Sequence, residues 1–93
     1  MEQLISDLTQ VILGHFHNAE LDLQLIPGSS GRVSGFLATD DFEGVSQRER
    51  QRILWDFLRK NVGIEEQQKV SSVLTLTTGE KEAFLEDVND TNH

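Results

Sequence analysis

The stretch that decides the fold is Leu21-Asp22-Leu23-Gln24-Leu25, followed by Pro27-Gly28-Ser29-Ser30-Gly31 and by residues 32–39. Apolar and polar residues alternate in the first part, which predicts a strand with one buried and one solvated face. The second part gathers turn-forming residues, including the chain's only proline. Residues 32–39 predict a second strand, so the two strands should pair antiparallel as a hairpin. Gly35 inside the second strand indicates a bulge or the close approach of a helix.

Helical patterns lie on both sides of this hairpin. Upstream, apolar residues recur at three- and four-residue spacing over residues 4–16, and Asn18 is a plausible stop. Downstream, Ser46 followed by Glu49 forms a capping box, so a second helix should start at Ser46. Gly63 is suited to cap the C-terminal end of that helix.

The rest of the chain predicts one more strand and one more helix. Residues 64–69 are polar and predict at most a short extra turn, whereas residues 70–78 are rich in Val, Leu and Thr. Strand alternation places four residues of that strand on one face: Val70, Ser72, Leu74 and Leu76. Thr77 followed by Glu80 is a second capping box, which begins a short helix with the apolar residues Ala83, Phe84, Leu85 and Val88.

The order of elements is therefore helix, strand, strand, helix, strand, helix. Because a helix connects the second and third strands, these two strands should be parallel, with a right-handed crossover. We expect a small α+β domain over residues 1–88, in which helices cover one face of a three-stranded mixed sheet. Residues 89–93 should form a disordered C-terminal tail.

Composition limits the function. The 93 residues include 16 acidic and 8 basic residues, which give a net charge of -8, and no cysteine. The lack of cysteine excludes disulfides, thiolate catalysis and cysteine-built metal sites. The net charge repels nucleic acid and anionic membranes at long range. No apolar run approaches the roughly 20 residues of a membrane span, and residues 1–7 do not resemble a signal peptide. We expect a soluble, cytoplasmic protein.

Basic residues concentrate in one segment of this acidic chain. Five of the eight lie on the second predicted helix: Arg48, Arg50, Arg52, Arg59 and Lys60. Helical spacing places three of the arginines on one face around Trp55, with the lysine beside them. A half-exposed Trp flanked by Arg is typical of an interface anchor. The alternative is a solvated face, with Trp55 covering the sheet edge and Glu49 and Asp56 pairing with the arginines.

Other titratable residues give weaker signals. His15 and His17 would point about 200° apart on a helix, so they could not share one metal ion. The carboxylates at Asp40, Asp41 and Glu43 lack the spacing of a calcium loop. No Ser-His-Asp set or phosphate-binding motif can be argued from the sequence. We expect no catalytic residues, no metal and no other cofactor.

Several motifs resemble the BolA-like family, which has a Phe-x-Gly loop followed on the next helix by Arg-His-Arg and an aromatic residue. Here Phe42-Glu43-Gly44 fits the loop, Arg50-Gln51-Arg52 the arginine pair and Trp55 the aromatic residue. Residues 70–82 look like that family's final strand and helix start. The resemblance covers residues 4–85 and implies a fold similar to the class II KH fold of nucleic-acid-binding domains.

The chain departs from the family at its histidines. Gln51 stands in place of the histidine of Arg-His-Arg, and Ser71 in place of the histidine that begins the last strand. In the family that last histidine is associated with an iron–sulfur cluster shared with monothiol glutaredoxins, and a Ser hydroxyl is a poor metal ligand. The resemblance thus implies a divergent member that keeps the fold and the partner surface without the cluster ligands. Residues 28–31 match the Gly-x-x-Gly clamp of KH domains but lie in the predicted turn.

Together these patterns predict a non-catalytic, BolA-like interaction or regulatory module. Its expected partner surface comprises Phe42, Gly44, Arg48, Arg50, Arg52, Trp55, Arg59 and Lys60. The resemblance implies a monothiol glutaredoxin as the protein partner. The alternative is a nucleic-acid-binding transcriptional regulator that uses the same basic helix, which the net charge disfavours.

Overall fold

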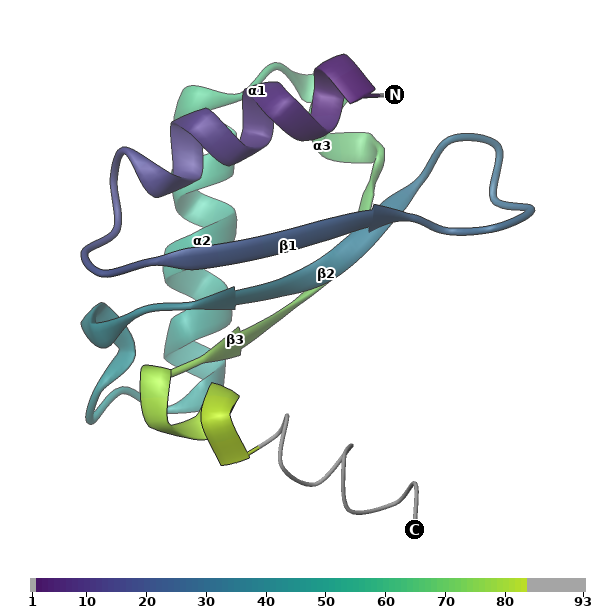
Figure 1. Cartoon of the computed structure of the whole chain (residues 1–93). Coiled ribbons are helices and arrows are strands. Elements are labelled where there is room, and N and C mark those ends of the chain that lie inside the picture. The colour runs from purple at the N-terminus through teal and green to yellow at the C-terminus, as the bar shows by residue number, and fades with distance from the viewer. Residues whose placement is uncertain (1, 84–93) are drawn as a thin grey trace, which may run out of the picture.

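The elements follow one another in the predicted order. The computed structural model describes residues 2–83 (Figure 1). Its elements are α1 (Glu2–Leu13), β1 (Glu20–Leu25), β2 (Val33–Ala38), the 3-10 helix η1 (Asp40–Phe42), α2 (Gln47–Asn61), α3 (Ile64–Gln68) and β3 (Val70–Leu76). A last helical segment covers residues 78–83. The predictions for residues 84–88 and for the tail at residues 89–93 lie outside the described residues.

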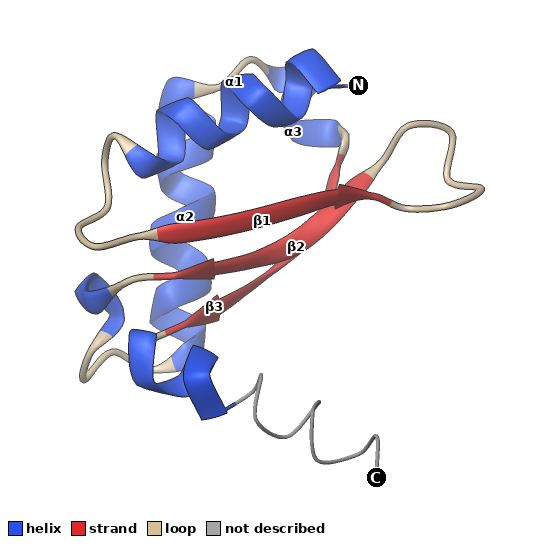
Figure 2. Ribbon diagram, in the orientation of Figure 1, coloured by secondary structure: helices blue, strands red, loops and turns tan. Residues whose placement is uncertain are grey.

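The sheet has the predicted mixed topology. Its strand order is β1-β2-β3, with β1 antiparallel to β2 and β2 parallel to β3. Helices α1 and α2 lie on the same side of the sheet, and α2 runs across the strands (Figure 2). The α+β architecture expected from the sequence is therefore confirmed.

The core lies between this helical layer and the inner face of the sheet. Leu8 and Ile12 of α1 and Leu54 and Leu58 of α2 are almost fully buried there. The sheet contributes Leu23, Val33, Leu37, Val70 and Val73. Full burial of each such side chain is worth about 1.5–3 kcal/mol, so this cluster supplies the main driving force for folding.

Helix α1 ends earlier than the apolar periodicity indicates. It stops at Leu13, and Gly14 and the residues after it form a turn that ends with Asn18 in the left-handed conformation, at φ 50°. Gly14 costs about 1 kcal/mol relative to Ala inside a helix, which favours termination there. Phe16 still enters the core, but through the turn, so the expected helical positions of His15 and His17 are wrong.

The predicted face of Val70 is also wrong. The register pairs Val33 with Val70 but Ser34 with Ser72, so Ser71 is an extra residue at a bulge in the ladder. The bulge returns Val70 to the buried face that carries Val73. Strict alternation cannot anticipate an inserted residue, and Ser71, expected on the face of Val73, is exposed. From Ser72 to Thr75 the exposed and buried residues alternate as predicted.

Two glycines have roles other than those expected. A Cβ at Gly35 would collide with the carbonyl oxygen of Asp22, so the close approach is made by strand β1 and not by a helix. Gly63 has an extended backbone and is the N-cap of α3, whereas Val62 is the C-cap of α2. Gly63 therefore starts the short helix rather than ending the long one in a left-handed cap.

Both predicted capping boxes begin helices. The Glu49 N–H donates to the Ser46 hydroxyl at 3.3 Å, at the start of α2. At the last helix the exchange is reciprocal, because the Glu80 N–H donates to Thr77 Oγ1 at 3.1 Å and the Thr77 N–H donates to Glu80 Oε1 at 2.9 Å. These bonds satisfy N–H groups that a helix start leaves without partners.

Candidate functional site

An exposed arginine stripe follows one side of α2. Arg48, Arg52 and Arg59 are all exposed, and their spacing of four and seven residues places them on one helix face. Arg52 pairs with Glu49 at 2.8 Å, and Arg59 pairs with Asp56. These are the pairs expected of a solvated face, and such exposed pairs are worth about 0–1 kcal/mol each.

Trp55 borders this arginine stripe and is half-buried. Its indole N–H donates to Gln51 Oε1 at 3.2 Å, while its ring packs against the edge of the core. The partial burial predicted from the helical position of Trp55 is thus confirmed. Helical spacing places Trp55 next to Arg52 and Arg59.

Gln51 connects Trp55 to the edge of the sheet. Its amide Nε2 donates to the Val73 carbonyl at 2.8 Å and to Thr75 Oγ1 at 3.0 Å. One turn earlier, Gln47 Nε2 donates to the Thr75 carbonyl at 3.1 Å. Side chains of α2 thus occupy the outward carbonyls of β3, which would otherwise be open for strand pairing.

Arg50 is inside the protein and does not belong to the exposed surface. Only 6% of the residue is exposed. Its guanidinium donates to the Val45 carbonyl at 2.7 Å, to the Thr75 carbonyl at 3.2 Å and to Glu80 Oε1 at 2.6 Å. Hydrogen bonds from Arg50 and from the Thr77 N–H hold the pKa of Glu80 below its usual value. Arg50 therefore joins α2, β3 and the last helix, and its expected contact with a partner is contradicted by its burial.

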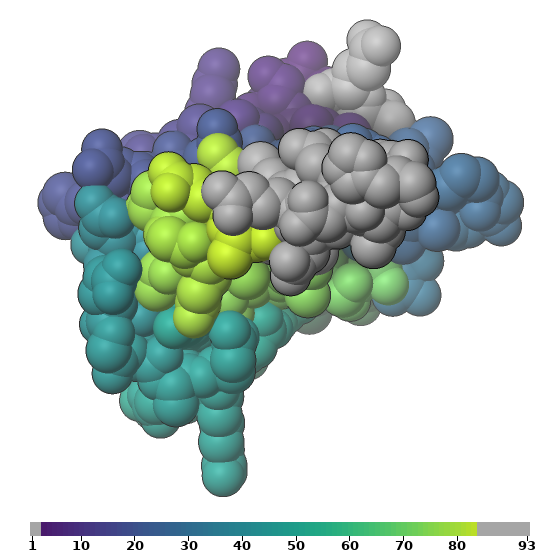
Figure 3. All heavy atoms as spheres, turned by 60° about the horizontal axis from the view of Figure 1, so that its bottom comes forward, coloured from purple at the N-terminus to yellow at the C-terminus, as the bar shows by residue number. Residues whose placement is uncertain are grey.

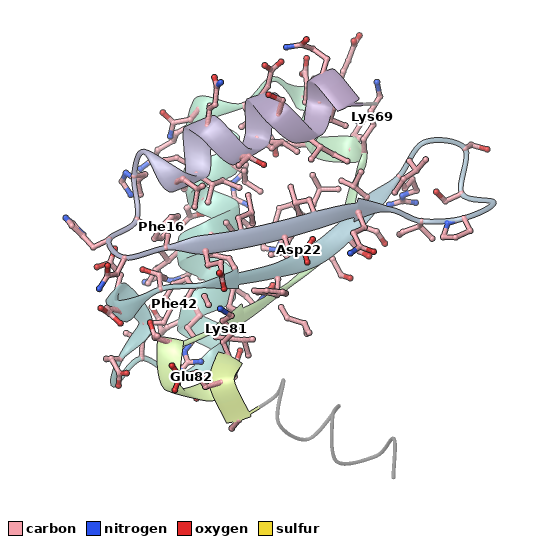
Figure 4. The ribbon with its side chains drawn as sticks, in the orientation of Figure 1. Phe16, Asp22, Phe42, Lys69, Lys81 and Glu82 are labelled. Atoms are coloured by element: carbon pink, nitrogen blue, oxygen red, sulfur yellow. The ribbon has the colours of Figure 1, made fainter. Side chains whose placement is uncertain are left out.

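Phe42 is likewise interior, and Gly44 serves the turn. Phe42 is 0% exposed and packs against Phe16, with 5.7 Å between the two ring centroids. Both rings lie at the same end of the core (Figure 4). The Arg50 guanidinium lies 5.9 Å from the centre of the Phe42 ring. Gly44 is exposed at φ 73°, a conformation that favours glycine. The loop motif thus contributes packing and a turn rather than an exposed aromatic anchor.

Lys60 lies about 80–100° around α2 from Arg52 and Arg59. It borders the arginine stripe without lying within it, because it directly follows Arg59 in the helix. It lines a shallow hollow with His15 and Phe57, and the His15 ring stacks on Phe57 at 4.3 Å. The structure therefore brings together four of the eight predicted surface residues: Arg48, Arg52, Trp55 and Arg59.

A separate polar cluster joins the α1–β1 turn to η1. Asn18 and Thr78 donate to the two oxygens of Asp40 at 2.8 and 2.7 Å, which lowers the pKa of Asp40. His17 Nδ1 lies 3.1 Å from an oxygen of Asp41. Among residues 2–83, no group of three or more His, Asp or Glu side chains converges as metal ligands. The bonds of this cluster connect the α1–β1 turn to η1, and η1 to the start of the last helical segment.

The Gly-Ser-Ser-Gly segment forms the hairpin turn. Ser29 Oγ donates to the Ile26 carbonyl at 2.6 Å and accepts from the Arg32 N–H at 3.0 Å. Gly28, Ser30 and Gly31 all have positive φ. Its sequence is thus explained by the conformation of the turn.

Comparison of the chain with protein-family models, with curated proteins and with solved structures finds no match. Over residues 2–83, each helix is too short or too polar to cross a membrane.

Proposed function

We propose that this protein is a non-catalytic, BolA-like interaction module that binds an acidic protein surface through α2. One observation carries the proposal. Three exposed arginines, Arg48, Arg52 and Arg59, line one face of α2 beside a half-buried Trp55, on a chain whose net charge is -8. Phe42 and Arg50 lie inside the protein, and Lys60 lies outside the stripe.

The stripe suits a carboxylate-bearing partner. The intrahelical pairs of Arg52 and Arg59 are exposed and weak, so carboxylates of a partner can replace Glu49 and Asp56 at little cost. Arg can bind a carboxylate through two parallel hydrogen bonds. Further burial of the Trp55 indole would add the apolar contribution typical of interface hot spots.

The resemblance suggests a monothiol glutaredoxin as the partner. The Gln51 amide is committed to Val73 and Thr75, and its oxygen accepts from Trp55. At this position the chain therefore has a structural amide where the family has an imidazole. This supports binding without a shared iron–sulfur cluster, because neither Gln51 nor Ser71 offers a good ligand.

Calorimetric titration with a purified monothiol glutaredoxin tests the proposal. Trp55→Ala and Arg52→Ala should each weaken binding by at least about 10-fold, as expected for hot-spot residues. Lys60→Ala is the matched control, because it removes a positive charge of the same helix outside the arginine stripe and should leave binding unchanged. Equal binding by all four proteins would refute the site. An iron-dependent visible absorption band in the complex would contradict the loss of cluster ligation.

The competing function is a nucleic-acid-binding regulator that uses the same arginines. Neutralising several phosphates would make the affinity for DNA or RNA fall steeply as salt rises. A gel-shift assay at low salt distinguishes the two functions. Without a shift there, the nucleic-acid function is removed.

A further inference from the structure

The two edges of the sheet differ in how they are protected. At β3, the outward carbonyls of Val73 and Thr75 accept hydrogen bonds from Gln47, Arg50 and Gln51. At β1, the other edge, no side chain among residues 2–83 makes a hydrogen bond to the backbone of Leu21, Leu23 or Leu25. Side chains of α2 therefore cover the β3 edge, whereas the β1 edge is free to pair with another strand.

The hydrogen-bond register shows which groups of β1 face outward. The Ile26 N–H donates to the Arg32 carbonyl at 2.8 Å, in continuation of the β1–β2 ladder. Bonding alternates along an antiparallel pair, so Glu20, Asp22 and Gln24 direct their backbone groups toward β2. The N–H and C=O groups of Leu21, Leu23 and Leu25 therefore point away from the sheet.

The side chains of this edge are also unusual for an unpaired strand. β1 has neither a proline nor a bulge within Glu20–Leu25, and its two charged residues, Glu20 and Asp22, lie on the outer face of the sheet. The Leu25 side chain, which lies on the inner face, leaves that residue 48% exposed at the end of the strand. The open edge thus combines free backbone groups with an apolar residue that is not covered.

We propose that β1 pairs antiparallel with β1 of a second copy of this chain, so that the two sheets become one six-stranded sheet. The pairing is centred on Leu23, which faces Leu23 of the second copy. Leu21 then faces Leu25 of the second copy on the inner side and covers it. On the outer side, Asp22 faces Gln24 of the second copy.

Charge favours this register over the two that are shifted toward Glu20. Centring the pair on Asp22 would place two Asp22 carboxylates opposite each other, and centring it on Leu21 would oppose Glu20 and Asp22. Like charges directly opposite in a sheet destabilise the pairing. In the Leu23 register an amide donor faces each carboxylate instead, because Asp22 and Gln24 are exchanged by the two-fold axis.

This interface is independent of the arginine stripe and differs from it in its response to salt. Each copy carries a net charge of -8, so screening of their mutual repulsion should strengthen dimerisation. A dimer formed through arginine–carboxylate pairs of α2 would weaken instead. The sign of the salt effect thus distinguishes the two surfaces.

Sedimentation velocity of the full chain over a micromolar to millimolar concentration range tests the proposal. The expected result is a monomer–dimer equilibrium that shifts toward dimer as salt rises. Gln24→Lys should tighten the dimer by roughly 2- to 30-fold, because each dimer gains two cross-strand pairs with Asp22. Gln24→Glu is the matched variant and should weaken it by a similar factor. Position 24 is exposed, so neither substitution should alter folding of the monomer.

A covalent test addresses the register directly, since the chain has no cysteine of its own. An equimolar mixture of Asp22→Cys and Gln24→Cys chains should form a mixed disulfide, because these positions are directly opposite in a non-hydrogen-bonded pair. A chain that stays monomeric throughout the range overturns the proposal. So does a dimer that is insensitive to both substitutions at Gln24, which would place the contact elsewhere.

Discussion

Replacement of Arg50 by methionine separates a buried structural arginine from the exposed ones on the same helix. Arg50→Met keeps most of the unbranched stem that packs beside Phe42 and removes the guanidinium. Arg52→Met makes the same chemical change two residues further on, where the arginine is exposed and bonded only to Glu49. The two variants therefore differ in burial and partners but not in the atoms removed.

The expected cost follows from the groups that lose a donor. The part-buried Val45 carbonyl loses its bond from Nε, and an acceptor left without a partner there costs about 1–3 kcal/mol. The Thr75 carbonyl retains the bond from Gln47, and Glu80, whose side chain is 47% exposed, can be hydrated. The loss of the Arg50–Glu80 pair therefore adds only about 0–1 kcal/mol. We expect about 2 kcal/mol in total.

Urea unfolding followed by the fluorescence of Trp55, the single tryptophan, measures both variants. Arg50→Met should lower the free energy of unfolding by about 2 kcal/mol, or the melting temperature by about 8–16 °C. Arg52→Met should change it by less than about 0.5 kcal/mol. If the two variants unfold at the same urea concentration, the Arg50 network does not stabilise the fold, and the reasoning from burial and hydrogen bonds fails.

Three further predictions concern stability. The hydrogen bond from Arg50 lowers the pKa of Glu80. The ionised Glu80 therefore stabilises the fold fully above the ordinary carboxyl pKa, and this stabilisation is lost as pH falls through the lowered value. Glu80→Gln should make the urea midpoint fall less steeply on acidification. Gly35→Ala should cost about 2 kcal/mol or more, because β1 must move away from the added methyl group. Gly79→Ala meets no atom within 4 Å and lies in the last helical segment, so it should stabilise the protein by up to about 1 kcal/mol in the same assay. Leu37→Ala removes a side chain that is 0% exposed and should cost about 2–5 kcal/mol, measured as a shift of the urea midpoint at unchanged slope.

The features of the fold that local sequence predicts are those decided within one helical turn or one strand. The alternation around Leu23 and the capping boxes at Ser46 and Thr77 required no knowledge of distant residues, and each is present in the structure. The bulge at Ser71 depends on how β3 aligns with β2. The role of Gly35 depends on the backbone of the neighbouring strand. Such features follow from tertiary pairing, which periodicity does not contain.

Part of the candidate site could be predicted from the sequence for the same reason. Helical spacing alone groups Arg48, Arg52 and Arg59 with Trp55. The same spacing places Arg50 next to Leu54 on the buried face, so its burial could have been predicted. A charged side chain is tolerated there only when carbonyls and a carboxylate accept its hydrogen bonds. Those acceptors come from the loop before α2, from β3 and from the last helix. Figure 3 shows these segments gathered at one end, with the yellow-green residues after β3 beside teal α2.

The four-residue spacing of side chains on α2 explains both why the edge of β3 is covered and why the arginines are exposed. Gln47, Gln51 and Trp55 are four residues apart, so they form a single row that lies over the edge of β3. Arg48 and Arg52 each follow a glutamine of this row by one residue, about 100° around the helix, so their side chains clear the sheet. Because the glutamine row fixes the rotation of α2 about its axis, its hydrogen bonds also hold the arginines outward. Loss of Gln51 should therefore weaken partner binding even though its own side chain is turned toward the sheet.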